Sequence, residues 1–475
     1  MELMPFNFDR LPNGQVFISN LAGFHHFIGE QDLIDLSDER ISSEQSNVLE
    51  SKLFITSESS SAITLYALSS AFAKRLMNEL AVRPIFMIVP TLRCDHTCKY
   101  CQVSRASVNA SGYDLNPELI PDIISAIKKL STPPYKIEIQ GGEPLLRFDL
   151  IQSIYDQCAE TLGRTNFEMV VASSLSVLNE DMIEWSRDRN ITFSVSLDGE
   201  EVVHNSNRIL GRGLAYSRTV SGVEAIKHSL GAGRVATVTT VTKELIRRPE
   251  SIVQAHLSLG LKDMFIRPVS PYGFAQKASF TFSMDEYFSF YASLIDEILK
   301  INNEGIRVVE HSASIHLKRI FNPGFSGYAD LKSPSGVVLN SILFNYDGRV
   351  YGSDESRMLQ KVNPETEFSA GEVKTLSFSD SPYYNAVLSS SFNFALPGCD
   401  TCAYQPFCGS DPCQNISVQG EPVGDRSRST FCQYHKGMFR YLMNCISEGG
   451  SKAEMLKGWA YVCEPPRVSW RVFYL

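Results

Sequence analysis

The 475-residue sequence lacks three features that define large classes of protein. It contains no apolar run of about 18 residues, the length that a membrane-spanning helix needs. Its 44 basic residues are outnumbered by 53 acidic ones, whereas nucleic-acid scaffolds usually carry a basic stripe. The first residues, Met1 to Pro5, lack the charged and then apolar layout of a signal peptide. We therefore expect a cytoplasmic protein with neither a membrane span nor a nucleic-acid partner.

Cysteine is absent from one long stretch and gathered on either side of it. None of the 11 cysteines lies between residues 159 and 398, whereas three lie at 94–101 and seven follow residue 398. Structural disulfides are rare in cytoplasmic chains, so this clustering points to metal. Cys158 stands alone in a helical apolar pattern, and we expect it to be a buried small hydrophobe.

No fourth cysteine lies near Cys94, Cys98 and Cys101, which are spaced Cys-x3-Cys-x2-Cys. An iron–sulfur cube is normally held by four thiolates, so three would leave one iron open to another ligand. One alternative is zinc with His96 as the fourth ligand, but a single short loop would then supply the whole tetrahedron. Structural zinc sites more often use two separated pairs. A disulfide is a weaker alternative, because nothing else in the chain looks secreted.

From residue 84 onward, short β-rich runs alternate with helical patterns. Six strands that alternate with helices predict an α/β fold with a parallel sheet, and six units make a partial, open (β/α)6 TIM-like barrel. In such barrels the active site lies at the carboxyl ends of the strands, where the three-cysteine loop begins. The expected strands are 85–89, 136–140, 167–172, 192–197, 235–241 and 264–268, and the helices are near 117–130, 149–162, 179–188, 217–230 and 246–259.

The second expected strand runs into Gly141-Gly142-Glu143-Pro144. Two glycines let a ligand approach the backbone closely, and Glu143 can accept a hydrogen bond from an amino group. Alone, this turn could be an ordinary strand-to-helix connection. Its place at the same end of the sheet as the cysteine loop favours a binding role.

Four segments follow from these patterns. Residues 1–83 form a small α+β module, with a hairpin at 6–18 around Asn13-Gly14 and an amphipathic helix at 61–80. This module is either a structural cap or a recognition surface for a peptide. Residues 84–310 form the barrel, residues 311–395 a bridging segment, and residues 396–475 a loop-rich module held together by metal.

The cysteine loop, the Gly-Gly-Glu-Pro turn and the later segment Ser194–Gly199 together resemble the radical S-adenosylmethionine (SAM) superfamily over roughly residues 84–270. The resemblance implies a [4Fe-4S] cluster on Cys94, Cys98 and Cys101 whose open iron chelates SAM. Reductive cleavage of SAM would then give a 5′-deoxyadenosyl radical that abstracts hydrogen from the substrate. The implied SAM contacts are Tyr100 at the adenine, Gly141, Gly142 and Glu143 at the amino group, and Ser196 and Arg208 at the ribose and carboxylate.

Two details qualify this resemblance. Many relatives have Thr-Asn-Gly after the third strand, where this chain has Ala172-Ser173-Ser174, so only the Ser174 hydroxyl would be offered to the cofactor there. The pair Asp198-Gly199 matches the Ser-Leu-Asp-Gly segment of peptide-modifying members, and it is equally compatible with a plain turn.

The cysteines after residue 398 are surrounded by turn residues, and the simplest alternative for them is a zinc knuckle. They resemble the SPASM extension of radical SAM peptide maturases, which implies one auxiliary [4Fe-4S] cluster on Cys399, Cys402, Cys408 and Cys432. A second auxiliary cluster is not expected, because Ser353 stands five residues after Gly348 where the family has cysteine. Cys413 is then a leftover or an alternative ligand, and Cys445 and Cys463 look structural.

Asp354 follows that serine, at the place where related sulfatase maturases have a general base. A solvated loop aspartate is the alternative. Residues 4–23 and the segment 351–359 resemble the B-type radical SAM maturases of His-Xaa-Ser systems. This resemblance implies a repeat-bearing peptide substrate and a second radical SAM maturase as partner. An electron donor such as flavodoxin or ferredoxin is also expected.

Three functions fit the sequence. The leading hypothesis is a radical SAM maturase that oxidises or crosslinks a ribosomally made peptide. The second is a radical SAM enzyme acting on a small molecule, which the carboxyl-terminal module disfavours. The third is a cluster-stabilised protein that presents a peptide to a partner enzyme, which the intact three-cysteine loop disfavours.

Overall fold

The computed structural model describes residues 1–38, 40, 42–80, 84–277, 282–322 and 328–461. Contacts divide the chain into two compact units. Of the described residues, the first comprises 1–80, 313–336 and 389–461 and the second comprises 84–312 and 337–388, apart from the gaps given above. The predicted bridging segment 311–395 is thus shared out between the two units. In the described part of the chain, no helix has both the length and the apolar content that crossing a membrane requires.

The second unit is built on a nine-stranded sheet in the order β14-β13-β12-β11-β10-β9-β6-β15-β16. Its six central strands pair in parallel, which confirms the α/β fold and the partial barrel. Each lies within two residues of its predicted bounds: β6 (Ile85–Thr91), β9 (Tyr135–Gly141), β10 (Phe167–Ser173), β11 (Ile191–Ser196), β12 (Val235–Val241) and β13 (Asp263–Pro268).

Three further strands extend the sheet, and the sequence pattern missed them because they are only two to four residues long. The strand β14 (Val309–Glu310) pairs in parallel with β13, and β15 (Ser341–Phe344) pairs in parallel with β6. The strand β16 (Val350–Tyr351) turns back antiparallel to β15. Residues 337–388 therefore complete one side of the barrel instead of bridging two domains.

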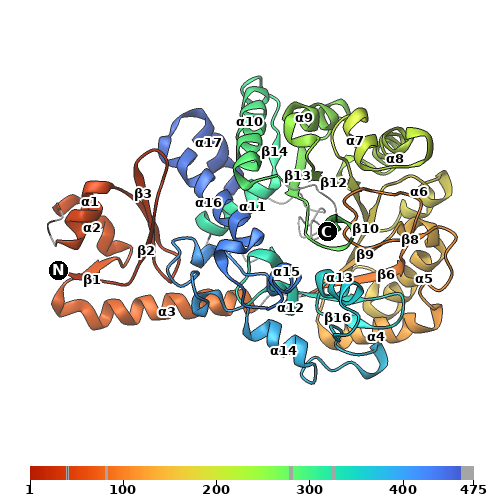
Figure 1. The fold of residues 1–475 in the computed structure, drawn as a ribbon, viewed down its shortest axis with the longest axis horizontal. Helices are drawn as coiled ribbons and strands as arrows, with labels where there is room; N and C mark the ends of the chain where they lie inside the picture. Colours follow the sequence, from red (N-terminus) through yellow and green to blue (C-terminus); the bar gives the residue numbers. More distant parts are fainter. Residues whose placement is uncertain (39, 41, 81–83, 278–281, 323–327, 462–475) are drawn as a thin grey trace. The chain divides into compact units, whose positions relative to one another are not determined.

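Helices cover the outer face of this curved sheet (Figure 1). Ile137 and Ile139 of β9 join the apolar core beneath helices α4 and α5. Since side chains alternate along a strand, Glu138 and Gln140 face the interior of the barrel. Cys158 is fully buried in α5, as predicted. The helices are α4 (Ile120–Leu130), α5 (Phe148–Cys158), α6 (Glu180–Ser186), α7 (Glu201–Asn207), α8 (Ala215–Leu230), α9 (Pro249–Ser258), α10 (Met284–Asn303), α13 (Asp354–Val362) and α14 (Pro382–Ser389).

The first unit begins with a small α+β layer. The predicted hairpin is confirmed: β2 (Asn7–Arg10) pairs antiparallel with β3 (Gln15–Ser19), and Gly14 has φ +86° in the turn between them. The strand β4 (His25–Gly29) completes the sheet, and α1 (Glu30–Ser37) and α2 (Ser43–Ser51) pack beside it. A cluster of buried apolar side chains holds this layer together: Val16, Ile18, Ile28, Leu36, Leu49, Phe54 and Ile55.

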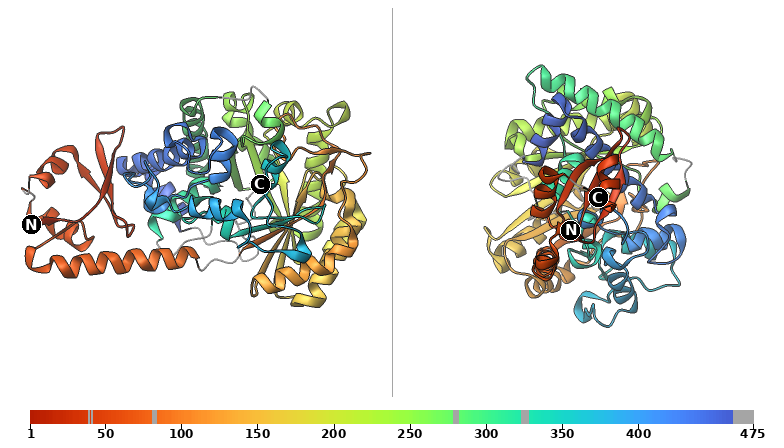
Figure 2. Two further views of the ribbon diagram at one scale, coloured as in Figure 1. Left: turned by 60° about the horizontal axis from the view of Figure 1, so that its bottom comes forward. Right: turned by 90° about the vertical axis from the view of Figure 1, so that its left-hand side faces the viewer.

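The predicted helix at 61–80 is one continuous helix, α3 (Ser61–Leu80) (Figure 2). The apolar stripe predicted on it (Ile63, Leu65, Leu68, Phe72, Leu76 and Leu80) was largely wrong. Leu68 is buried, but Ile63, Leu65 and Leu80 are 72%, 52% and 50% exposed. A polar contact contributes to the packing instead, because buried Glu79 forms an ion pair with Arg319 at 2.6 Å.

The carboxyl-terminal part of the first unit is loop-rich only before Pro412; after it the described residues are mostly helical, which the turn residues of the sequence did not predict. Residues 389–411 form turns and short helices. Three longer helices follow: α15 (Pro412–Gln419), α16 (Thr430–Glu448) and α17 (Gly450–Ala460). The helix α11 (His311–Phe321) belongs to the first unit from Ala313 onward.

Candidate functional site

The three-cysteine loop leaves the carboxyl end of β6 and continues through the short strand β7 (Arg93–Cys94). Cys94, Cys98 and Cys101 are free and half-buried, and they line a cavity of about 140 Å³. Neighbouring loops fix its backbone: the Thr97 N–H donates to the Ile209 carbonyl at 2.8 Å, and the Lys99 N–H donates to Asn207 at 3.0 Å. The cysteines therefore lie at the end of the barrel that the sequence predicted.

The thiol environment fits a cluster better than a single zinc ion. Burial raises the pKa of Cys94 and Cys98, the latter to about 12, so a positively charged metal must stabilise their thiolates. Three thiolates on one zinc would lie about 3.8 Å apart. Among the described residues, the one trio of candidate metal ligands within 4.8 Å of one another is Cys94, Asp95 and His96, which holds a single thiol. The zinc site of three cysteines and His96 is therefore not formed.

Gly141 and Gly142 bring the end of β9 against the cysteine loop. A Cβ on Gly142 would lie 2.2 Å from the Arg93 carbonyl oxygen, and one on Gly141 would lie 2.2 Å from that of Thr91. The Gly142 N–H donates to Thr91 at 2.9 Å, and the Glu143 N–H donates to Arg93 at 2.8 Å. The glycines line the cavity, but the close approach that they permit here is between two segments of the chain.

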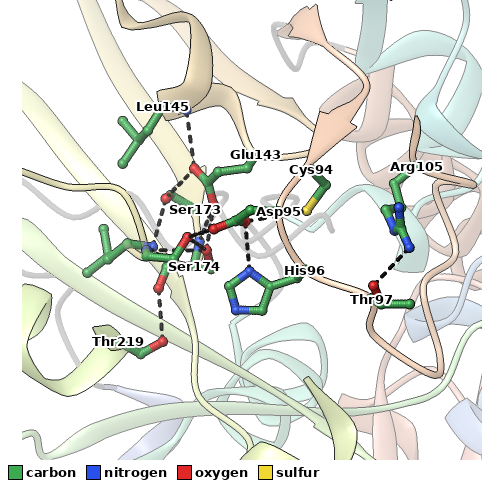
Figure 3. A network of polar contacts seen from close by, with 12 residues as sticks. Cys94, Asp95, His96, Thr97, Arg105, Glu143, Leu145, Ser173, Ser174 and Thr219 are labelled. Carbon is green, nitrogen blue, oxygen red and sulfur yellow. Dashed lines mark hydrogen bonds and ion pairs between the residues drawn. The ribbon is translucent and has the colours of Figure 1, made fainter. Parts of the chain in front are cut away.

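Glu143 is buried and its carboxylate is fully hydrogen-bonded (Figure 3). Oε1 accepts from the Ser173 hydroxyl at 2.7 Å and from the Leu145 N–H at 3.2 Å. Oε2 accepts from the Ser174 hydroxyl at 2.6 Å and from its N–H at 2.9 Å. Burial raises the Glu143 pKa, although the serine hydrogen bonds act to lower it. Ser174, expected to offer its hydroxyl to the cofactor, bonds Glu143.

A chain of polar contacts joins Glu143 to the cysteine loop through the serines (Figure 3). The hydroxyls of Ser174 and Ser176 are 2.9 Å apart, and Ser176 donates to Asp95 Oδ2 at 2.6 Å. Asp95 Oδ1 in turn contacts His96 Nδ1 at 2.9 Å. The sequence analysis missed the role of Asp95 and Ser176, because nothing in the spacing of these residues brings them together before the barrel closes.

Tyr100, Ser196 and Arg208, which the resemblance implied as SAM contacts, also line the cavity. The residue that positions two of them is Asp198, which is fully buried. Its Oδ2 accepts hydrogen bonds from the Tyr100 hydroxyl and from Arg208 Nε, the latter at 2.9 Å. Its Oδ1 accepts from the Thr240 N–H at 3.1 Å. Asp198 is therefore far more than the plain turn residue that the sequence also allowed.

A second group of buried charges lies inside the barrel. Ser353 caps α13, and its side chain accepts a hydrogen bond from the Ser356 N–H, so a serine here begins a helix. The next residue, Asp354, is 2% exposed, which excludes the solvated loop aspartate. Its Oδ1 accepts two hydrogen bonds from Arg357, at 2.8 and 2.7 Å. Burial and the nearby Asp354 raise the pKa of Glu138 to about 8, although Arg267 acts to lower it.

The carboxyl-terminal cysteines gather in the first unit. Cys399, Cys402, Cys408 and Cys432 are free and half-buried. Burial raises the pKa of Cys408 well above its usual value, and the other three thiols raise it further, so the four sulfurs are near one another. Cys413 and Cys445 are buried in α15 and α16. The remaining cysteine, Cys463, lies outside the described residues.

Residues 88–253 match the model of the Radical SAM superfamily, so this part of the chain is similar to that superfamily. An uncharacterized protein of Methanocaldococcus jannaschii is 30% identical over 112 residues, which make up 24% of this chain and 37% of that protein. A probable GTP 3′,8-cyclase of Archaeoglobus fulgidus is 30% identical over 138 residues, or 29% of this chain and 42% of that protein. The chain thus spans about two fifths of the length of these relatives.

Solved structures share the fold over a longer stretch. The structure of anSMEcpe with bound AdoMet has a TM-score of 0.63 at 14% identity and covers 79% of this chain and 100% of its own. Streptococcus suis SuiB bound to precursor peptide SuiA has a TM-score of 0.54 at 13% identity and covers 91% of this chain and 99% of its own. At these identities the likeness establishes the fold.

Proposed function

We propose that the protein is a radical SAM peptide maturase. The observation that carries this proposal is the meeting of three free cysteines with Gly141, Gly142 and Glu143 around one cavity at the carboxyl end of the barrel. Cys94, Cys98 and Cys101 would hold a [4Fe-4S] cluster, with SAM on its open iron. When reduced, such a cluster supplies the electron that cleaves SAM to methionine and a 5′-deoxyadenosyl radical.

The residues around the cavity fit this assignment by the chemistry that they offer. Burial raises the pKa of the Cys94 and Cys98 thiols, so a bound metal would be needed to hold them as thiolates. Arg208 offers a cation beside the cavity, held in place by Asp198, for a carboxylate. Ser196 and Tyr100 would lie along the ribose and adenine. Glu143 would accept a hydrogen bond from the amino group of SAM with the same carboxylate oxygens that accept from the Ser173 and Ser174 hydroxyls.

A peptide is the substrate that the whole chain favours. Two proteins of similar fold were solved with peptides, anSMEcpe with the Cp18Cys peptide and SuiB with its precursor peptide SuiA. The resemblance to B-type His-Xaa-Ser maturases narrows the proposal to a repeat-bearing peptide, with a second radical SAM maturase as partner. Residues 1–83 would recognise that peptide, and flavodoxin or ferredoxin would donate electrons.

The carboxyl-terminal cysteines support one auxiliary cluster. Cys399, Cys402, Cys408 and Cys432 would hold a second [4Fe-4S] cluster, with Cys413 outside the ligand set. Asp354 would serve as the general base beside the substrate, because two hydrogen bonds from Arg357 hold its Oδ1 in place and its Oδ2 has no hydrogen-bond partner.

A small-molecule radical SAM enzyme is the second candidate function, and the similarity to probable GTP 3′,8-cyclases of two archaea favours it. One experiment separates the two. The gene is co-expressed with a His-Xaa-Ser repeat peptide and the peptide is weighed by mass spectrometry. A loss of two mass units supports peptide oxidation or crosslinking. An unchanged peptide, together with 5′-deoxyadenosine formation stimulated by GTP, supports the small-molecule enzyme.

A further inference from the structure

The floor of the cavity carries hydrogen-bond acceptors that the protein leaves unused. Glu138 and Gln140 face the barrel interior from β9, and each is 2% exposed. Neither carboxylate oxygen of Glu138 has a hydrogen-bond partner, and neither does Gln140 Oε1. Asp354 Oδ2 is also buried without a partner. Native proteins rarely leave such groups unpaired in their interior, so four of them in one place need an explanation.

Sheet register puts Glu138 directly beneath the cavity that Gln140 lines. Gln140, Ala172 and Ser194 line its wall on β9, β10 and β11, and Ala172 pairs with Ser194. Glu138 lies two residues before Gln140 on the same face and pairs with Val170, two residues before Ala172. Glu138 is therefore one side-chain layer deeper in the barrel than the cavity wall.

The charges around this layer balance. Asp354 is paired with Arg357, and Arg267, which also lines the cavity, is near enough to act on the pKa of Glu138. Asp354 offsets Arg357, and Glu138, whose pKa burial raises to about 8, is largely uncharged near neutral pH, so no surplus negative charge remains to attract a cation. What the layer offers is mainly acceptors, because Gln140 Oε1 and Asp354 Oδ2 have no partner and the Glu138 carboxyl keeps an acceptor oxygen even when it is protonated.

We propose that Glu138, Gln140 and Asp354 form a subsite that binds a neutral hydrogen-bond donor of the substrate, such as an amide, hydroxyl or imidazole side chain. This deepens the proposed function, on which it rests, by naming the side-chain class that the cavity selects. Glu138 is then a specificity-determining residue. A substrate without a donor leaves the buried oxygens unpaired, and binding sites of this kind reject such analogues strongly.

The test uses acetamide, which has two N–H donors, and N,N-dimethylacetamide, which has none. Equilibrium dialysis with the labelled amides measures their binding to the full-length, reconstituted protein. We expect acetamide to bind at least about tenfold more tightly than its dimethyl analogue. Glu138→Leu should abolish this preference, and Glu138→Gln, which keeps one acceptor, should reduce it. The matched control Glu168→Leu, on neighbouring β10, should leave it unchanged.

The Tm of the same variants distinguishes a binding role from a structural one. If Glu138 serves a ligand, Glu138→Leu removes an unsatisfied buried group and its Tm equals or exceeds that of the wild type. A lower Tm, an equal affinity of the wild type for both amides, or an intact preference in Glu138→Leu would overturn the proposal. Dialysis needs no SAM cleavage, so a failure to form 5′-deoxyadenosine would reject the proposed function and not this subsite.

Discussion

Two buried glutamates, five positions apart on β9 and the turn that follows it, have opposite surroundings. Glu143 accepts hydrogen bonds on both oxygens from the protein itself, whereas Glu138 has no partner on either oxygen. Both are almost inaccessible to water. Burial therefore does not distinguish them, but the supply of donors does. Glu143 is part of the hydrogen-bonded wall of the cavity, whereas Glu138 lies beneath that wall with its oxygens unpaired.

The matched substitutions Glu143→Gln and Glu138→Gln are expected to give the largest contrast. The amide in Glu143→Gln can accept on one atom only, so buried serine donors lose their acceptor and unfolding becomes easier by about 2–4 kcal/mol. Glu138→Gln should not lower the free energy of unfolding, because it removes a buried carboxyl whose raised pKa disfavours the folded state near neutral pH. Urea denaturation of both variants measures this. Equal losses would erase the distinction between the two sites.

Gly142→Ala tests whether the wall depends on close backbone contact. The new Cβ would lie 2.2 Å from the Arg93 carbonyl oxygen, so β9 and the cysteine loop must separate. We expect a loss of about 2 kcal/mol or more and weakened iron binding at the three cysteines. The control is Gly211→Ala, where a Cβ meets nothing within 4 Å. Iron content and Tm should change only in the first variant.

A serine pair repeats the comparison on a smaller scale. Ser174→Ala removes the hydroxyl that donates to Glu143, and it should lower the free energy of unfolding by about 1–2 kcal/mol. The Ser194 hydroxyl is equally buried but has no partner, so Ser194→Ala should have an effect near zero. Thermal unfolding of the two variants provides the measurement. A larger loss of stability in Ser194→Ala than in Ser174→Ala would mean that the Ser194 hydroxyl does have a hydrogen-bond partner.

The pH dependence of stability tests the raised pKa of Glu138. The pKa of Glu138 in the folded protein is raised to about 8 from its usual 4.5. Between these two pH values the folded protein keeps a proton on Glu138 that the unfolded chain has released. This contribution is fully present below pH 4.5 and is lost as the pH rises through 8. Between pH 5 and 8 the wild-type Tm should fall about 3–4 °C further than that of Glu138→Gln. Parallel curves would refute the raised pKa.

Much of the barrel could be predicted from the sequence, because buried parallel strands are continuous apolar runs that alternate with helices. The cysteine loop and Gly141–Glu143 were placed correctly for the same reason: both follow strands whose carboxyl ends meet. The strands β14, β15 and β16 were missed, since two to four residues carry no periodic signal. The face of α3 was misjudged because an ion pair of Glu79 with Arg319 contributes to its packing.

The site's supporting contacts were harder to foresee. Asp198, Asp95 and Ser176 act through partners far away in the chain, which only the closed barrel brings near. Glu138 did leave a trace in the sequence, as a charged residue in the middle of a strand expected to be apolar on both faces. A charge in such a position needs either a partner or a function, and the structure shows no partner for its oxygens.

The central claim is that the three-cysteine loop holds a cluster that cleaves SAM. The most direct test is to reconstitute the full-length protein with iron and sulfide under anaerobic conditions, add SAM and dithionite, and measure 5′-deoxyadenosine by chromatography. We predict that the wild type forms it and that Cys98→Ala does not, although Cys413→Ala retains the activity. A correctly loaded wild-type protein that forms no 5′-deoxyadenosine would contradict the account.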